Sequence, residues 1–238
     1  MRHLKRRNQT LRRFHTPRTV KQKILSSVCF RPSGFDKEDK SHLNGRLERV
    51  IVYIDAFNLR ISIEEAGLNQ YKWVNIEKLV YSLLQPHQTL VEIKYFTSII
   101  TCNHKQKKRQ LKYLNSLNES NIHIVYGNYK WESIPCSKCN SNYHFIKEKM
   151  TDVNIATSII VDAFKSEFDT AILISGDTDL IPPINEVHRL FNHKRVLIAF
   201  PPNRQNALMA FASKGSVTIG KKKIINSRFQ ADIFKKTG

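Results

Sequence analysis

The chain has 238 residues, enough for one domain of ordinary size with an extension, and 39 Lys and Arg stand against 20 Asp and Glu. A formal net charge of +19 favours a polyanionic partner, and nucleic acid leads the candidates. The longest strongly apolar runs, at 50–54 and 171–174, are far shorter than the roughly 20 residues that cross a bilayer, so we expect no membrane span.

The cysteines and the N-terminal segment bear on the compartment. Four scattered cysteines (Cys29, Cys102, Cys136 and Cys139) are too few for a disulfide scaffold in a chain of this size, which favours a reducing compartment. The N-terminal segment lacks the apolar stretch of a secretory signal. Its first 35 residues contain several Arg and no acid, which leaves an organellar transit peptide open. We expect a cytosolic protein.

The expected elements alternate once an N-terminal basic arm ends. Residues 1–48 lack sustained apolar periodicity and are expected to form a disordered arm, followed by a domain over 49–238. In that domain the pattern predicts strands at 49–55, 89–100, 121–129, 169–177 and 194–200, and helices at 73–84, 105–118, 152–164 and 180–191. The segment 216–234 is expected to form an edge strand or a short helix. Such alternation predicts an α/β fold with a mainly parallel sheet and helices on both faces.

Aspartates follow two of the predicted strands. Asp55 ends the first strand, in VYIDAFN, and Asp177 follows another, in LISGDTD. Asp179 lies in the same turn, where Gly176 is expected to let the backbone bend tightly. Asp152 begins a predicted helix that leads into the strand before Asp177. Because ligands bind beyond the carboxyl ends of strands in open α/β sheets, we expect these four acids to converge there.

Each aspartate alone has an ordinary explanation, because Asp is a favoured N-cap and Asp55, Asp152 and Asp179 precede helical segments. Four acids packed together would repel one another and raise their pKa values unless a cation compensated. Mg²⁺ or Mn²⁺, which prefer carboxylate oxygens, would remove that cost. Metal binding is therefore the better joint interpretation. Asn58, three residues after Asp55, is expected either beside this site or as a solvated helix-start residue.

These motifs resemble those of the NYN domain, a PIN-like nuclease group that includes LabA-like proteins. The resemblance runs from about Val50 to Phe234 and rests on YIDAFN, EKMTDVNIA and ILISGDTDLIPPI in that order. It implies a PIN-like three-layer sandwich and a ribonuclease dependent on Mg²⁺ or Mn²⁺ that leaves a 5′-phosphate and a 3′-hydroxyl. It also implies an acidic cluster of Asp55, Asp152, Asp177 and Asp179, with Asn58 beside it and Ser175 in support.

One position departs from the family pattern. Many relatives have a further Asp six residues after the one matched by Asp152, where this chain has Ser158. Asp162, one turn later, is expected to face either the site or the solvent, and we leave it out of the catalytic set. A metal-dependent reaction needs no covalent intermediate, and since no Ser-His-Asp or Cys nucleophile pattern stands out, water is the expected nucleophile.

Two further segments carry chemistry. The run 105–112 opens a helix with five cations and no Glu partner at i+4, which favours RNA phosphate contact over a merely solvated face: Lys105, Lys107, Lys108, Arg109 and Lys112. An insertion at 131–147 interrupts the alternation and contains Cys136, Cys139 and His144. Its spacing suits a structural zinc if Cys102 or His104 adds a fourth ligand; the alternative is a loop with two reduced thiols.

Three functions follow from these patterns. The first is a metal-dependent endoribonuclease, which the four aspartates favour. The second is an RNA-binding or regulatory module without turnover, which Ser158 favours. The third, a phosphotransfer enzyme, ranks last because the first strand ends in Asp55 alone, without an Asp-x-Asp motif.

Overall fold

The computed structural model describes residues 46–229 except 102, 121, 137, 138 and 140. The chain divides into two units, 1–42 and 43–238, and everything described belongs to the second. Apart from its last residues, the expected basic arm over 1–48 lies outside the described residues.

The domain is built on a sheet of six strands that are all parallel. Their order across the sheet is β3 (His123–Tyr126), β2 (Gln88–Thr97), β1 (Glu48–Asp55), β6 (Thr170–Ile174), β7 (Arg195–Phe200) and β8 (Ser216–Thr218). Nearly every side chain of the central strands β1 and β6 is buried, as expected for strands covered on both faces.

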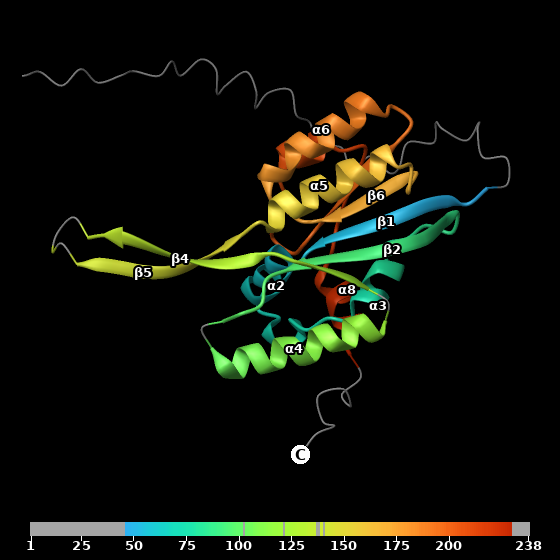
Figure 1. The fold of residues 1–238 in the computed structure, drawn as a ribbon. Coiled ribbons are helices and arrows are strands. Elements are labelled where there is room, and N and C mark those ends of the chain that lie inside the picture. Colours follow the sequence, from blue (N-terminus) through green and yellow to red (C-terminus); the bar gives the residue numbers. More distant parts are fainter. Residues whose placement is uncertain (1–45, 102, 121, 137–138, 140, 230–238) are drawn as a thin grey trace, which may run out of the picture. The chain divides into compact units, whose positions relative to one another are not determined.

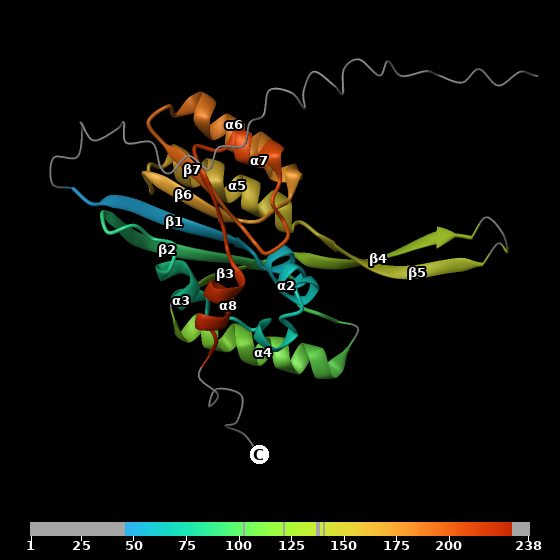
Figure 2. The ribbon, with the colours of Figure 1, turned by 180° about the vertical axis from the view of Figure 1, so that it is seen from behind.

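Helices cover both faces and complete three layers (Figure 1). One face carries α2 (Ala56–Glu65), α3 (Ile76–Tyr81), α4 (His104–Glu119) and α8 (Lys221–Asn226). The other carries α5 (Thr151–Phe164), α6 (Ile181–Leu190) and α7 (Ala207–Ala212), as Figure 2 shows from behind. Two short 3-10 helices, η1 (Asn69–Tyr71) and η2 (Thr178–Leu180), join these elements. The predicted α/β three-layer sandwich is confirmed.

The chain reverses its direction of winding between β1 and β6. From β1 it proceeds outward through β2 to β3, and it then returns to β6 on the other side of β1 before continuing to β7 and β8. Such a switch point leaves a crevice beyond the carboxyl ends of the two central strands, because their following segments turn to opposite faces. Asp55 and Asp177 both lie at this crevice.

The expected insertion is an antiparallel hairpin rather than an irregular loop. Strands β4 (Asn128–Pro135) and β5 (Asn142–Lys149) pair along their full length, and the hairpin extends away from the sheet (Figure 1). Most of its described side chains are exposed, including Trp131, Ile134 and Tyr143. The sequence pattern predicted no strand for most of this segment because most of the described side chains are exposed, so no alternation marks a buried side.

Asp162 corrects an expectation, because it faces neither the site nor the solvent. It lies on the buried side of α5, where Tyr53 donates a hydrogen bond to its Oδ2 (2.6 Å) and Lys94 Nζ lies 2.7 Å from the same atom. Which side of an amphipathic helix meets the sheet depends on tertiary packing that spacing alone does not define. The pair joins α5 to β1 and β2.

Replacing Lys94 with Met should therefore destabilise the domain, because Asp162 would lose its countercharge while remaining buried. We expect a loss of about 3 kcal/mol in the free energy of unfolding, measured by chemical denaturation. The matched control is Arg189→Met, which breaks an exposed ion pair with Glu186 and should cost less than about 1 kcal/mol. Equal losses in the two variants would show that the Asp162 pair does not stabilise the fold.

Candidate metal and nuclease site

Asp55 is the buried centre of the candidate site. It ends β1 and caps α2, since its Oδ1 accepts a hydrogen bond from the backbone N–H of Asn58 (3.0 Å). Its other oxygen, Oδ2, accepts from the hydroxyl of Ser175 (2.9 Å), which directly follows β6. Only 4% of Asp55 is exposed. Asp55 therefore caps a helix and also belongs to the candidate site.

Two hydrogen bonds join the motifs after β1 and β6. Ser175 Oγ accepts from the backbone N–H of Asp177 (3.1 Å) while it donates to Asp55. Asn58 Oδ1 accepts from the backbone N–H of Gly176 (3.1 Å). The side chain of Asn58 therefore holds the turn after β6 against the start of α2, so it is more than a solvated helix-start residue.

Gly176 is required for a different reason from the one expected. A Cβ built at this position would lie 2.5 Å from the carbonyl oxygen of Arg204 and 2.7 Å from its Cβ. The loop after β7 thus packs directly on the turn that carries Asp177. Close approach of a neighbouring backbone, and not a positive φ, excludes a side chain here.

Burial and neighbouring charges shift the pKa values of two of these acids. Burial, together with the smaller effects of the Asp152 and Glu148 charges, raises the pKa of Asp55 to about 7, although the hydrogen bonds from Asn58 and Ser175 lower it. Burial also raises the pKa of Asp152, with further contributions from Asp177, Asp179 and Glu148. A cluster of acids at one edge of the sheet therefore carries an electrostatic cost that a cation would remove.

The remaining acids differ in what holds them. Asp177 caps η2, because its Oδ1 accepts from the backbone N–H of Asp179 (3.0 Å). Asp152 lies in the first turn of α5 without capping it, since the N-cap is Met150. Asp152 and Asp179 are both exposed. Two carboxylates of the cluster are thus fixed by hydrogen bonds, whereas Asp152 and Asp179 belong to exposed residues, of which Asp152 keeps enough partial burial to raise its pKa.

The donor chemistry fits a hard divalent cation. Among the residues described, no three His, Cys, Asp or Glu side chains converge, as placed, closely enough to hold a metal ion. Carboxylate oxygens are nevertheless the ligands that Mg²⁺ and Mn²⁺ prefer, and such ions retain several waters, so two or three protein carboxylates suffice.

Sequence reasoning missed two residues at this edge. Glu148 ends the hairpin beside the cluster, raises the pKa of both Asp55 and Asp152, and accepts a hydrogen bond from the hydroxyl of Thr151 (2.7 Å). It belongs to the motif EKMTDVNIA, which was a usable signal. Arg204, after β7, pairs with Glu65 at the end of α2 (2.7 Å). In the sequence, only the position of Arg204 shortly after a predicted strand indicated that it could lie at this edge.

The zinc candidates are not brought together as a trio. Cys136 and Cys139 lie at the hairpin turn, where the Cys139 Sγ contacts Ser141 Oγ (2.8 Å). His144 stands opposite Ser133 in the strand register, further along the ribbon. Cys102 lies outside the described residues, and His104 begins α4. Hydrogen bonds with Ser141 and Cys136 lower the pKa of Cys139, so the two thiols are neighbours. The zinc clip stays a prediction, because His144 is not brought to them.

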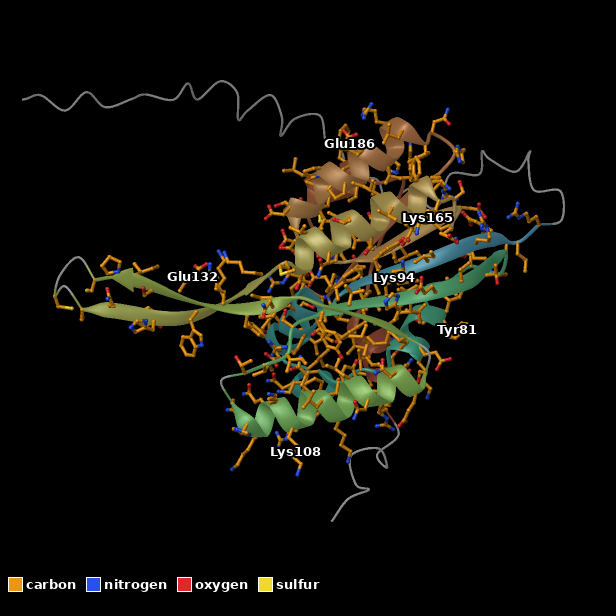
Figure 3. The ribbon with its side chains drawn as sticks, in the orientation of Figure 1. Tyr81, Lys94, Lys108, Glu132, Lys165 and Glu186 are labelled. Carbon is orange, nitrogen blue, oxygen red and sulfur yellow. The ribbon has the colours of Figure 1, made fainter. Side chains whose placement is uncertain are left out.

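The basic run lies on α4, as predicted. The buried side of this helix consists of Gln110, Tyr113, Leu114 and Leu117, and Lys105, Lys108 and Arg109 are exposed (Figure 3 labels Lys108). Lys107 and Lys112 are partly exposed. Gln110 Nε2 donates to the carbonyl of Ser98 (2.9 Å), so the first turns of α4 lie beside the carboxyl end of β2. The basic run therefore belongs to the N-terminal part of α4, which lies on the carboxyl side of the sheet.

Comparison with known proteins agrees with this geometry. No curated protein matches the chain. A solved structure of a protein of unknown function from Vibrio parahaemolyticus shares the fold, with 21% sequence identity and a TM-score of 0.54, over 74% of this chain and 95% of that one. In the described residues no helix is long and apolar enough to span a membrane. The NYN domain model matches residues 49–218, and the chain therefore belongs to the NYN domain family, with a PIN-like nuclease fold.

Proposed function

We propose that the protein is an endoribonuclease that hydrolyses RNA with Mg²⁺ or Mn²⁺. The observation that carries this proposal is the buried Asp55, whose raised pKa and acidic neighbours Asp152 and Glu148 mark a site that needs a positive charge. A strongly perturbed carboxyl at the switch point of an α/β sheet is where catalytic sites are expected. Membership of a family of nuclease-like proteins supports the same reaction class.

The residues divide the work as follows. Asp55, Asp152, Asp177 and Asp179 would hold the cation, which when bound lowers the pKa of a water and neutralises charge on the phosphate. Ser175 holds the Asp55 carboxylate and the backbone of Asp177 in register. Asn58 fixes the turn at Gly176. Such prior positioning matters because an ordered carboxylate does not have to reorganise as charge develops.

The positive charge of the chain would bind the RNA substrate. The cations of α4 (Lys105, Lys107, Lys108, Arg109 and Lys112) would bind RNA phosphates and bring the strand over the carboxyl edge of the sheet. Because such binding releases counterions from the RNA phosphates, the affinity should fall as the salt concentration rises. The domain over 49–238 would act alone in cleavage, and the basic arm over 1–48 would add affinity without sequence preference.

A second function has one observation in its favour. Ser158 stands where many relatives carry an acid, and it is half-buried on α5. A chain with fewer carboxylates binds a cation more weakly, which would leave an RNA-binding module with little turnover. The two functions differ in whether RNA is cut, because both predict RNA binding.

Cleavage should depend on Asp177. With a labelled single-stranded RNA and Mn²⁺, we expect Asp177→Asn to slow cleavage by about 100-fold or more, because one carboxylate ligand is removed. Glu186→Gln, a change of the same charge on the exposed side of α6, should cut at the wild-type rate. Binding without cleavage under either metal would support the regulatory module instead. Equal rates in all three proteins would point to a contaminating nuclease.

The stability of the metal-free protein should reflect the Asp55 carboxyl. The pKa of this carboxyl is about 7 in the fold against an ordinary value of 3.8, so the stability that it contributes is full below about pH 4 and is lost as pH rises through 7. In EDTA, the melting temperature of Asp55→Asn relative to wild type should therefore rise between pH 5 and pH 8. Glu186→Gln should show no such trend. A constant difference for Asp55→Asn would contradict the raised pKa.

The α4 cations should control the salt dependence of RNA affinity. Replacing Lys105, Lys108 and Arg109 with Gln should weaken binding and flatten the slope of log K against log salt by up to about 0.7 for each phosphate that the variant no longer binds. The control changes Lys78 and Lys165 to Gln; Lys78 lies on α3 and Lys165 directly follows α5. Unchanged slopes in the α4 variant would place the RNA elsewhere.

A further inference from the structure

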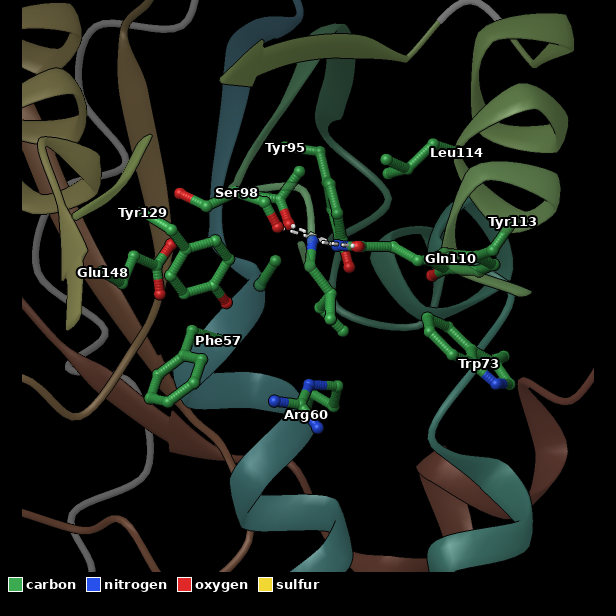
Figure 4. A pocket seen from close by; sticks show the side chains of 13 residues that line it. Phe57, Arg60, Trp73, Tyr95, Ser98, Gln110, Tyr113, Leu114, Tyr129 and Glu148 are labelled. Atoms are coloured by element: carbon green, nitrogen blue, oxygen red, sulfur yellow. Dashed lines mark hydrogen bonds between the residues drawn. The ribbon is translucent and has the colours of Figure 1, made fainter. Parts of the chain in front are cut away.

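A pocket opens beside the acid cluster on the α4 side of the sheet (Figure 4). Its enclosed space is only about 20 Å³, and the larger volume of about 390 Å³ includes open solvent in front of it, so a ligand larger than a water would bind at the mouth. Ala56 and Phe57, which directly follow Asp55, form part of its wall, and Glu148 forms another part. Consecutive Cα atoms are about 3.8 Å apart, so Phe57 is within one nucleotide's reach of Asp55. The pocket and the acid cluster are thus neighbours across the end of β1.

Five aromatic residues from different elements line the pocket: Phe57, Trp73, Tyr95, Tyr113 and Tyr129. Tyr95 and Tyr113 form a buried back wall with ring centroids 6.2 Å apart, and the Trp73 ring lies 5.0 Å from that of Tyr113. Phe57 is 44% exposed at the mouth. Buried aromatic rings behind an exposed Phe57 ring suit a flat aromatic ligand, because such a ligand stacks on ring faces that are already in position.

Polar groups interrupt these aromatic walls. The Arg60 guanidinium lies over the Phe57 ring at 5.5 Å from its centroid, and Arg60 lines the pocket. Gln110 keeps the floor in place through hydrogen bonds to Ser98 O and from Ile100 N–H. Ser98 Oγ is buried at the same floor and has no hydrogen-bond partner among the described residues. A purely apolar ligand would gain nothing from these groups, whereas a base presents both a π-face and polar edges.

Electrostatic coupling joins the pocket to the cluster. Burial raises the pKa of Tyr95 in the back wall; the charge of Arg60 lowers it, and those of Asp55 and Glu148 raise it. Asp55 and Glu148 therefore act electrostatically on the pocket as well as on the acid cluster. The register places Tyr95 beside Ile54, one residue before Asp55. An RNA strand that crosses the carboxyl edge of the sheet from α5 toward α4 would therefore pass first the acids and then the pocket.

We propose that the mouth of this pocket binds a base of the RNA strand next to the scissile phosphate, with the exposed Phe57 as its stacking residue. The inference rests on the proposed nuclease function and adds a subsite that selects unpaired bases, since a paired base has no free face to offer. Phe57 positions the strand and takes no part in the chemistry.

Trp73 provides a direct readout of pocket occupancy. The chain has two tryptophans, and the other, Trp131, is 65% exposed on the hairpin. Changing Trp131 to Phe leaves Trp73 as the sole tryptophan. In EDTA, so that nothing is cut, titration with a tetra-adenylate should change its emission saturably. Ribose 5-phosphate, which has no base, should leave the emission unchanged over the same concentrations.

Variants at Phe57 test the stacking role in this background. Phe57→Leu removes the ring but keeps an apolar side chain, and it should weaken binding by about tenfold, within the range for loss of one base stack. Phe57→Tyr keeps the ring and should bind within about twofold of the parent. The control Phe164→Leu makes the same change at a 77% exposed ring that ends α5, and it should bind as the parent does.

The outcomes separate this inference from the nuclease proposal. Equal affinity of Phe57→Leu and Phe57→Tyr would overturn the stacking subsite. So would silent Trp73 emission while labelled RNA binds by anisotropy, because the RNA would then lie elsewhere. A ring-dependent Trp73 response without any cleavage would keep the pocket and reject the nuclease. Absence of all RNA binding would reject both.

Discussion

The hydrogen bond from Ser175 to Asp55 is the interaction on which the site depends. It joins the carboxyl ends of the two central strands, and its acceptor is a carboxylate that is almost completely buried. Because Ser175 also accepts from the backbone of Asp177, one hydroxyl fixes the positions of two acids that lie far apart in the chain. The second link, from Gly176 to Asn58, prevents the turn from rotating about the first.

This arrangement explains how a chain with a net charge of +19 keeps a local excess of acid. The cluster costs free energy in the metal-free protein, since burial and like charges favour the neutral form of Asp55. A fold can sustain such a cost when the surrounding packing determines the geometry, and strained groups of this kind gather at functional sites. The buried network formed by Asp162, Lys94 and Tyr53 lies in the α5 layer and anchors the helix that carries Asp152.

Much of the fold and part of the site could be predicted from the sequence. Apolar strand runs followed by acids placed Asp55 and Asp177 at one edge, because parallel strands share their carboxyl edge. The role of Asn58 could not be read in this way, since its partner Gly176 is distant in the chain. Glu148 was missed because the hairpin that carries it is mostly exposed and shows no periodicity, although the motif EKMTDVNIA contains it. Asp162 was misplaced because helix spacing does not tell which side packs on the sheet.

The most direct test of the account is binding of Mn²⁺ itself. Isothermal titration calorimetry in buffers of different ionisation enthalpy measures both the affinity and the protons released, and binding to a carboxyl with a pKa of about 7 should release more protons at pH 6.5 than at pH 8. The account predicts saturable binding with this pH dependence in the wild-type chain and its loss in Asp55→Asn. Equal binding by the two proteins, or no saturable binding by the wild type, would contradict it.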